Sequence, residues 1–336
     1  MKKRRILALV MVVTLVSGLV ATGCAASAPS SILYGSSSVK SSWYVAHAKM
    51  AELGDKAMPN TSVTVVPGGA ISATQGIYDG ELQLAGIGAG NMVDIALGRG
   101  AWADNLGENK LRALYSYGLV PNPIAVRADS DIYDVMDFEG TKIFLGNPGG
   151  STESSHIEAF KVLGINYEAV PGNLQDGATA FKDRRADGFL KATTGTSVDA
   201  THTDIMTTTD LRFIGFTDEQ VKKIKVESPS IAFTTIPAKF YVVGLPEKDI
   251  NVIVFIAAVA GRDDFPEELA YQWTKSVIEN WGELAAVNPA SAAMDPLESP
   301  TIISQKQGAF MHPGAIRYFR EKGVDVPDAV IPPEMK

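Results

Sequence analysis

Cysteine is almost absent from this chain, which has a single one, Cys24, among 336 residues. A lone cysteine excludes an intrachain disulfide and every metal or redox motif that is built on paired cysteines. The four histidines are scattered without metal-ligand spacing, and neither Gly-x-Ser-x-Gly nor His-Glu-x-x-His occurs. We therefore expect no metal, no cofactor and no enzymatic activity.

Basic side chains are also few, because 30 lysines and arginines stand against 38 aspartates and glutamates, for a net charge of −8. The first 23 residues hold four of the cations and no acid, which leaves 26 basic and 38 acidic residues, a net charge of −12, in the rest. Recognition of nucleic acid depends on a basic surface. This imbalance argues against nucleic acid as a partner.

Long apolar runs are missing except at the start of the chain. There a basic stretch at residues 2–5 precedes a 15-residue apolar run, Ile6 to Val20. The length fits the apolar region of an export signal and is shorter than the ~20 residues of a membrane span. We interpret residues 1–23 as a signal peptide of the lipoprotein type and residues 24–30 as a polar tether.

The position of Cys24 adds to this interpretation. The run Ala21-Thr22-Gly23-Cys24 resembles a bacterial lipobox, in which the cysteine becomes the lipidated first residue of the mature protein. We expect an exported protein, periplasmic or at the cell surface, that is anchored to the membrane through Cys24. The alternative is an ordinary signal peptide with an incidental cysteine.

The body of the chain alternates short apolar strands with helical segments, which is typical of α/β domains. Strands are indicated at 31–35, 63–65, 82–87 and 142–145, and apolar residues from Leu269 to Leu284 recur at every third or fourth position. This last pattern predicts one amphipathic helix, for which Asp264 and Glu267 form a capping-box-like start. We expect two α/β lobes with crossings near residues 125 and 240 and a ligand cleft between them.

Three strand-to-helix loops are rich in glycine or serine: Ser41-Ser42, Gly68-Gly69 and residues 146–152. Backbone N–H groups at such helix starts can bind an anionic group, and glycine lets a ligand approach closely. The alternative is a set of tight turns without a ligand. A dinucleotide motif is not complete at residues 86–91, because Asn91 stands where the last glycine is required.

Residues 310–323, Phe-Met-His-Pro-Gly-Ala followed by an aromatic-rich segment, resemble the C-terminal signature of the TAXI solute receptors of TRAP transporters. The resemblance spans about residues 31–325. It continues, in chain order, at residues 68–85, 126–130, 146–153 and 271–284.

This resemblance implies a type II periplasmic-binding-protein fold, with lobe 1 at 31–124 and 242–336 and lobe 2 at 125–241. It implies an extracytoplasmic receptor that captures a small organic acid such as glutamate for membrane permease subunits. A binding protein of an ABC importer and a ligand-sensing lipoprotein with the same fold are the alternatives. Carried over by position, the ligand-binding residues are Ser42, Trp43, Tyr44, Gly68, Gly69, Gly149, Gly150, Ser151, Thr152, Thr193, Thr194, Gly195 and Tyr241.

We expect the ligand to carry a carboxylate that backbone N–H groups and hydroxyls hold without a metal. Trp43 and Tyr44 are predicted to form an aromatic wall, although either could instead pack into the core. Lys40, Arg127 and Lys191 lie beside the proposed loops and could add a salt bridge. Ala73 and Ala89 replace polar residues that are common in the family, and this leaves a neutral ligand as the alternative.

Overall fold

The structure is a computed structural model that describes residues 31–37, 39, 41–58, 60–102, 109–148, 151–194, 198 and 200–336. The predicted signal peptide, the tether, Cys24, Lys40, Gly149, Gly150 and Gly195 lie outside these residues, as does the side chain of Ser42. Within the described segments, no helix is both long enough and apolar enough to cross a membrane.

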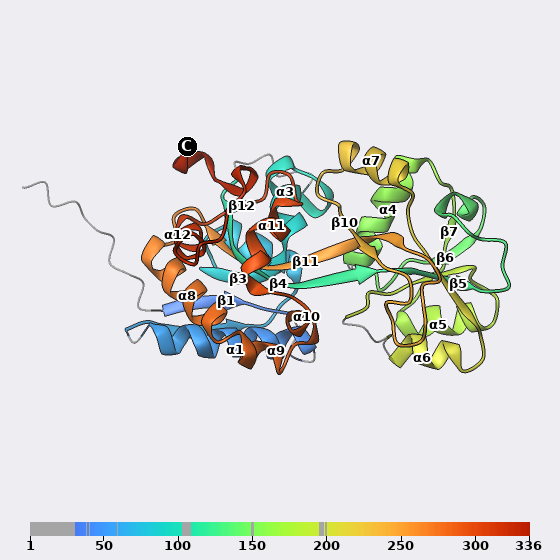
Figure 1. The fold of residues 1–336 in the computed structure, drawn as a ribbon, viewed down its shortest axis with the longest axis horizontal. Helices are drawn as coiled ribbons and strands as arrows, with labels where there is room; N and C mark the ends of the chain where they lie inside the picture. The colour runs from blue at the N-terminus through green and yellow to red at the C-terminus, as the bar shows by residue number, and fades with distance from the viewer. Residues whose placement is uncertain are drawn as a thin grey trace, which may run out of the picture.

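A seven-stranded sheet forms the centre of one half of the molecule, the larger lobe (Figure 1). Its strand order is β12-β4-β11-β3-β1-β2, and β10 pairs with β11. β1, β2 and β3 are parallel, whereas β11 runs antiparallel to β3, β4 and β10. The strands are β1 Ser31–Gly35, β2 Ser62–Val66, β3 Leu84–Gly88, β4 Leu111–Asn122, β10 Ala232–Ile236, β11 Ile250–Arg262 and β12 Phe310–Met311.

Helices cover this sheet. Helices from the C-terminal part of the chain pack in the same lobe as helices from its N-terminal part. α8 packs against both α1 and α12, so the two ends of the chain share one lobe. The helices here are α1 Ser42–Ala57, α2 Ala70–Tyr78, α3 Ala89–Leu97, α8 Glu267–Glu279, α9 Trp281–Ala285, α10 Pro289–Ala292, α11 Ser299–Ser304 and α12 Pro313–Glu321. Short 3₁₀ turns are η1 Gly100–Trp102, η3 Pro296–Glu298, η4 Asp328–Val330 and η5 Pro333–Met335.

A five-stranded sheet of order β7-β6-β8-β5-β9 forms the smaller lobe. Its strands are β5 Ile124–Arg127, β6 Lys142–Phe144, β7 Glu168–Ala169, β8 Gly188–Leu190 and β9 Leu211–Ile214. Its helices are α4 Ser151–Leu163, α5 Leu174–Lys182, α6 Ala200–Met206 and α7 Asp218–Glu227, with the 3₁₀ turn η2 Val135–Phe138. The predicted α/β class with two lobes is confirmed.

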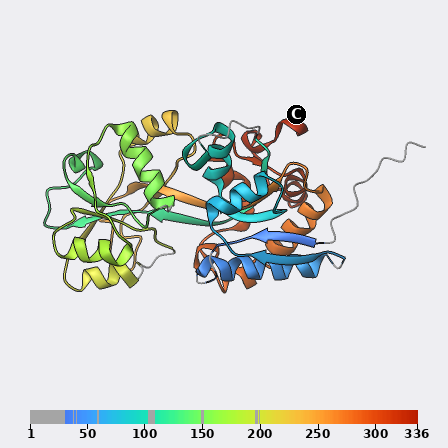
Figure 2. The ribbon, with the colours of Figure 1, turned by 180° about the vertical axis from the view of Figure 1, so that it is seen from behind.

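Three strands run between the lobes, namely β4, β10 and β11 (Figure 1; Figure 2 from behind). Ile250 and Val252, at the start of β11, belong to the same apolar cluster as Phe189 and Phe213 of the smaller sheet. We propose that the chain returns to the larger lobe within β11, which is later than residue 241.

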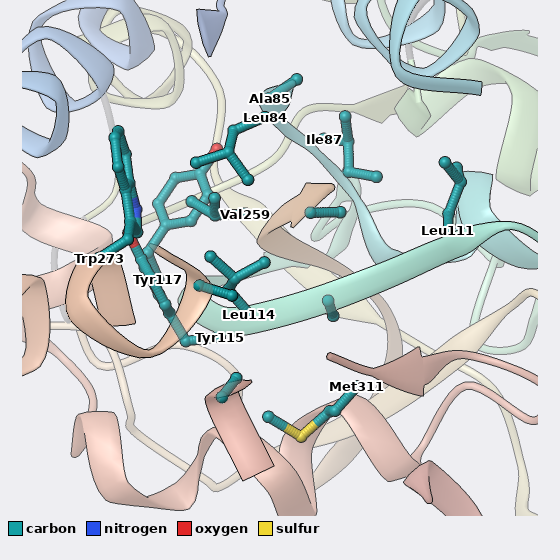
Figure 3. Close-up of a cluster of buried hydrophobic side chains, with 14 of the residues drawn as sticks. Leu84, Ala85, Ile87, Leu111, Leu114, Tyr115, Tyr117, Val259, Trp273 and Met311 are labelled. Atoms are coloured by element: carbon teal, nitrogen blue, oxygen red, sulfur yellow. The ribbon is translucent and has the colours of Figure 1, made fainter. Parts of the chain in front are cut away.

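The core of the larger lobe surrounds Trp273, whose side chain is fully buried (Figure 3). Its indole N–H donates to the Tyr115 hydroxyl at 3.0 Å, and its ring packs edge-on against Tyr34 with centroids 5.2 Å apart. Burying large aromatic rings contributes much of the apolar stabilisation of a core, and the indole N–H needs such a partner once it is buried. α8 is thereby fixed on the sheet that carries the candidate site.

The single helix predicted across residues 269–284 is wrong, because Asn280 separates α8 from α9. Asparagine competes with helical hydrogen bonding through its own side chain, and here its amide donates to a backbone carbonyl of the preceding turn. The capping box of Asp264 and Glu267 is also absent: Asp264 pairs with Arg262 at 2.9 Å, and α8 begins after a proline without a side-chain cap.

Candidate functional site

Trp43 lies in the first turn of α1, at the end of the helix that faces the connecting strands. The helix begins at Ser42 because the Ser41 hydroxyl accepts the Trp43 backbone N–H at 3.2 Å and so satisfies one free donor. The half-buried Trp43 ring stands edge-on to Tyr117 of β4, with centroids 5.7 Å apart. Trp43 therefore lies where β4 leaves the larger lobe.

A buried hydrogen-bond network around His47 connects the elements next to Trp43. The Ser36 hydroxyl and the Tyr117 hydroxyl bond to the two ring nitrogens of His47, at 2.7 Å and 2.6 Å. Burial lowers the pKa of His47 to about 4, so its ring is neutral at physiological pH. This network connects the loop after β1, helix α1 and strand β4. It also requires a glycine at position 86, because a Cβ there would stand 2.1 Å from His47 Nε2. No sequence motif indicates it, because Tyr117 is 70 positions from His47.

The loops of the smaller lobe attach to the last residues of the same strand. Thr152, in the first turn of α4, donates from its hydroxyl to Asn122 Oδ1 at 2.7 Å. The Thr193 backbone N–H donates to the Pro121 carbonyl at 2.9 Å. Because strand residues advance by about 3.3 Å, Gly118 beside Trp43 and Pro121 are separated by about 10 Å. The predicted residues of the two lobes thus flank one short stretch of β4.

Thr193 and Tyr241, both predicted to bind the ligand, are each 1% exposed and bond to each other through their hydroxyls at 2.6 Å. Tyr241 packs in an apolar cluster of the smaller lobe. In this structure the pair supports the backbone after β8, where Thr194 is exposed. A direct contact of either side chain with a solute stays a prediction.

The remaining predicted groups are placed as follows. Gly68 and Gly69 follow the edge strand β2, where the Ser72 hydroxyl accepts the Gly69 N–H at 3.1 Å. Tyr44 is half-buried beside Trp43. Arg127 is buried in the smaller lobe, where it donates to the Ala186 carbonyl at 2.6 Å and pairs with Asp187 at 3.1 Å. These contacts leave Arg127 unsuited to the ligand role considered from the sequence.

A cavity of about 640 Å³ lies between the lobes. Its walls include α3 of the larger lobe and α4 of the smaller lobe, and residues 254–256 of β11 contribute to its lining. In Figure 1, α3 and α4 lie on the same side of the connecting strands. The volume falls within the ~300–1,000 Å³ of small-molecule sites. Of the described residues predicted to bind ligand, Ser151 alone lines this cavity.

The polar lining of the cavity is hydroxyl-rich, and its charges are balanced. Four serines, three cations and three carboxylates contribute to it: Ser151, Ser154, Ser155, Ser230, Arg99, Lys161, Lys306, Asp94, Glu158 and Glu227. Ser151 opens the 13-residue helix α4, so the positive end of the helix dipole faces this region. Among the described residues, no group of three or more His, Cys, Asp or Glu side chains could hold a metal ion.

Lys306 is the most buried cation of this lining, with 5% of the residue exposed. Its ammonium donates to the Ser230 carbonyl, and the Ser230 hydroxyl bonds to the Asp94 carboxylate. Burial lowers the pKa of Lys306 to about 7, although the nearby Asp94 charge opposes this. Burial also raises the pKa of Asp94. Lys306 belongs to no motif, so sequence reasoning missed it.

Two α/β lobes, connected by shared strands and separated by a cavity, form the fold of periplasmic solute-binding proteins. A TctC solute-binding protein from Polaromonas has a similar structure, with a TM-score of 0.52 at 12% identity over 89% of this chain and 99% of that one. At this identity the similarity shows the fold alone.

A family model described as the NMT1-like family matches residues 34–323, and the chain belongs to that family. A putative sulfonate-binding protein, SsuA, of an ABC transporter from Methylobacillus flagellatus is similar at 13% identity, with a TM-score of 0.49 over 91% of this chain and 92% of that one. A TRAP periplasmic solute-binding protein from Ochrobactrum anthropi is similar at 14% identity, with a TM-score of 0.46 over 91% of this chain and 85% of that one. No curated protein matches the chain.

Proposed function

We propose that this protein is the extracytoplasmic solute receptor of a TRAP transporter of the TAXI type. It captures a small organic acid, such as glutamate or a related carboxylate, and delivers it to membrane permease subunits. The observation that carries the proposal is the cavity of about 640 Å³, to which both lobes contribute. The fold, the family and the His-Pro-Gly-Ala segment at residues 312–315 support it.

Closure of the lobes around the solute is the proposed mechanism. A solute that contacts both α3 and α4 gains more contacts when the lobes approach, and only such a difference in affinity can shift the equilibrium toward the closed form. The permease then recognises the closed receptor. Because the body of the protein is acidic, affinity for an anion has to come from local donors rather than from long-range attraction.

A thermal-shift panel tests the proposal. We use acetate, succinate, glutarate, L-glutamate, taurine and the amides of the carboxylic acids, because a ligand that binds only the native state raises the melting temperature. We expect at least one acid to raise it and its amide to have a much smaller effect. If no member of the panel shifts the melting temperature, the proposed receptor function is wrong. An equal shift by acid and amide would instead favour a neutral ligand.

Trp43→Ala is expected to weaken binding of the best panel acid about tenfold or more. Burying an aromatic side chain against a ligand contributes about 1.5–3 kcal/mol, and 1.4 kcal/mol corresponds to a factor of ten. Neither Trp43 nor Tyr133 lines the cavity between the lobes. Tyr133→Ala is the matched control, because Tyr133 is an exposed aromatic of the smaller lobe that lies in none of the loops predicted to bind the ligand. Calorimetry measures both, and unchanged affinity in Trp43→Ala would show that the ring packs as part of the core only.

Cys24 is expected to be the first residue of the mature protein and to carry lipid. Stable anchoring requires more than one acyl chain, which lipoprotein modification supplies. Mass spectrometry of protein purified from membranes reads the N-terminus directly. Cys24→Ser should move the protein to the soluble fraction without changing its melting temperature. An unmodified N-terminus beyond residue 24 would contradict this expectation.

The type of transporter is tested by reconstitution with candidate permeases. Uptake of the panel acid that requires a sodium gradient supports the TRAP assignment, whereas uptake that requires ATP would assign the receptor to an ABC importer. The two outcomes leave the binding function itself unchanged.

A further inference from the structure

Lys306 combines burial with unused hydrogen-bonding capacity. It follows α11 and lines the cavity, yet only 5% of the residue is exposed. An ammonium group has three N–H donors. Within the described part of the chain, the Ser230 carbonyl is the one acceptor that bonds to it. Two donors are therefore available to a group that enters the cavity.

The neighbouring carboxylates have other hydrogen-bond partners. Glu158 of α4 accepts from the Ser228 hydroxyl at 2.8 Å, and Asp94 of α3 bonds to the Ser230 hydroxyl. The charged and titratable groups that face Lys306 or line the same cavity are Asp94, Arg99, Glu158, Lys161, Lys225 and Glu227. Asp94 is thus a nearby counter-charge for Lys306, but it does not use the two remaining donors.

We propose that Lys306 receives the anionic group of the solute, while the hydroxyls of Ser151, Ser154 and Ser155 face it from the start of α4. This inference rests on the proposed receptor function and assigns the charge of the solute to one residue. Charge-assisted hydrogen bonds are stronger than neutral ones, and water exclusion in the closed cleft strengthens them further. The class of solute is a small molecule with a carboxylate or sulfonate at the end that reaches Lys306.

Proton uptake follows from the burial of Lys306. Burial lowers the pKa of Lys306 in the unliganded receptor to about 7, so this side chain is mostly neutral at pH 8. A bound anion favours the ammonium form and raises this pKa again. Binding at pH 8 therefore takes up protons, whereas binding at pH 6, where Lys306 is already mostly charged, takes up far fewer.

Calorimetry with the best acid or sulfonate of the panel tests this. In HEPES and in Tris at pH 8, the binding enthalpies of the wild type should differ by a large part of the difference in buffer ionisation enthalpy, and at pH 6 the difference should be far smaller. Lys306→Met should weaken binding about tenfold to hundredfold and remove the proton uptake. Lys306→Arg, which keeps the charge, should retain more of the affinity than Lys306→Met does.

Lys223→Met is the matched control, because it removes the same charge from an exposed lysine of α7 that does not line the cavity. We expect less than about a threefold change in affinity and unchanged proton uptake. If Lys306→Met does not fold, the inference is tested by the wild type alone. A binding enthalpy of the wild type that is the same in both buffers at pH 8 overturns the inference. Unchanged affinity in a folded Lys306→Met also overturns it and leaves the receptor function standing, whereas a panel without any binder overturns both.

Discussion

Acidification from pH 6.5 to pH 4 is expected to destabilise this protein by about 3 kcal/mol for each of three buried histidines. Burial lowers the pKa of His47, His156 and His312 to about 4, whereas the unfolded chain titrates near 6.5. Between these values the unfolded state binds more protons, so stability falls as the pH falls. The combined loss of about 8–9 kcal/mol is comparable to the whole stability of a typical domain.

Burial lowers the pKa of each of the three rings and so keeps it neutral, while hydrogen bonds fix the position of the ring. His156 bonds through Nδ1 to the Thr152 carbonyl at 2.8 Å, which requires the proton on that nitrogen. His312 caps α12, because its Nδ1 accepts the Gly314 N–H at 3.2 Å while Nε2 donates to the Phe265 carbonyl at 2.9 Å. A second proton on either ring enters an apolar environment, which is unfavourable.

Urea unfolding at pH 7, 6, 5 and 4 measures this effect. His156→Gln removes one of the three titrating rings. The free energy of unfolding of this variant should therefore fall by about one third less between pH 6.5 and pH 4 than that of the wild type. The control is the same substitution read at pH 7, where the ring is neutral and only the loss of packing counts. A free energy of unfolding that stays constant from pH 6.5 to 4.5 would show that the three rings do not titrate as their burial requires.

Gly314→Ala is expected to lower stability by about 3 kcal/mol. A Cβ at this position would stand 2.2 Å from the Glu267 carbonyl oxygen and 2.8 Å from the Tyr271 nitrogen, both of them backbone atoms of α8. A backbone cannot move aside as a flexible side chain does, so α12 has to shift away from α8, and overpacking of this kind is destabilising. Thermal and urea unfolding measure the loss.

Gly282→Ala is the matched control, because it lies in α9 and a Cβ there meets no atom within 4 Å. Alanine favours a helix over glycine by about 1 kcal/mol, so this variant should be unchanged or slightly more stable. If Gly314→Ala is as stable as Gly282→Ala, the close approach of α12 and α8 is not a requirement of the fold. A loss of stability in Gly314→Ala alone would show that the glycine of the His-Pro-Gly-Ala segment is needed for the close packing of α12 on α8.

Much of the fold follows from local sequence pattern. Short apolar segments followed by serine or glycine at a helix start indicate a strand and then a helix, and these occur at α1 and α2 as expected. The reason is that capping and periodicity act over a few residues. The helix predicted across Asn280 failed for a related reason, since the apolar pattern continues while the side-chain amide of that residue bonds to the preceding turn.

The sequence by itself determined the two-lobed α/β class and the resemblance to one family of receptors, because strand-helix alternation and short motifs are local. Only the tertiary structure brought Lys306 beside Ser230 and Asp94, joined His47 to Tyr117, and buried Tyr241 against Thr193. These contacts join residues far apart in the chain. The changed pKa values and the internally bonded hydroxyls that result depend on burial, and burial arises only when the whole chain folds.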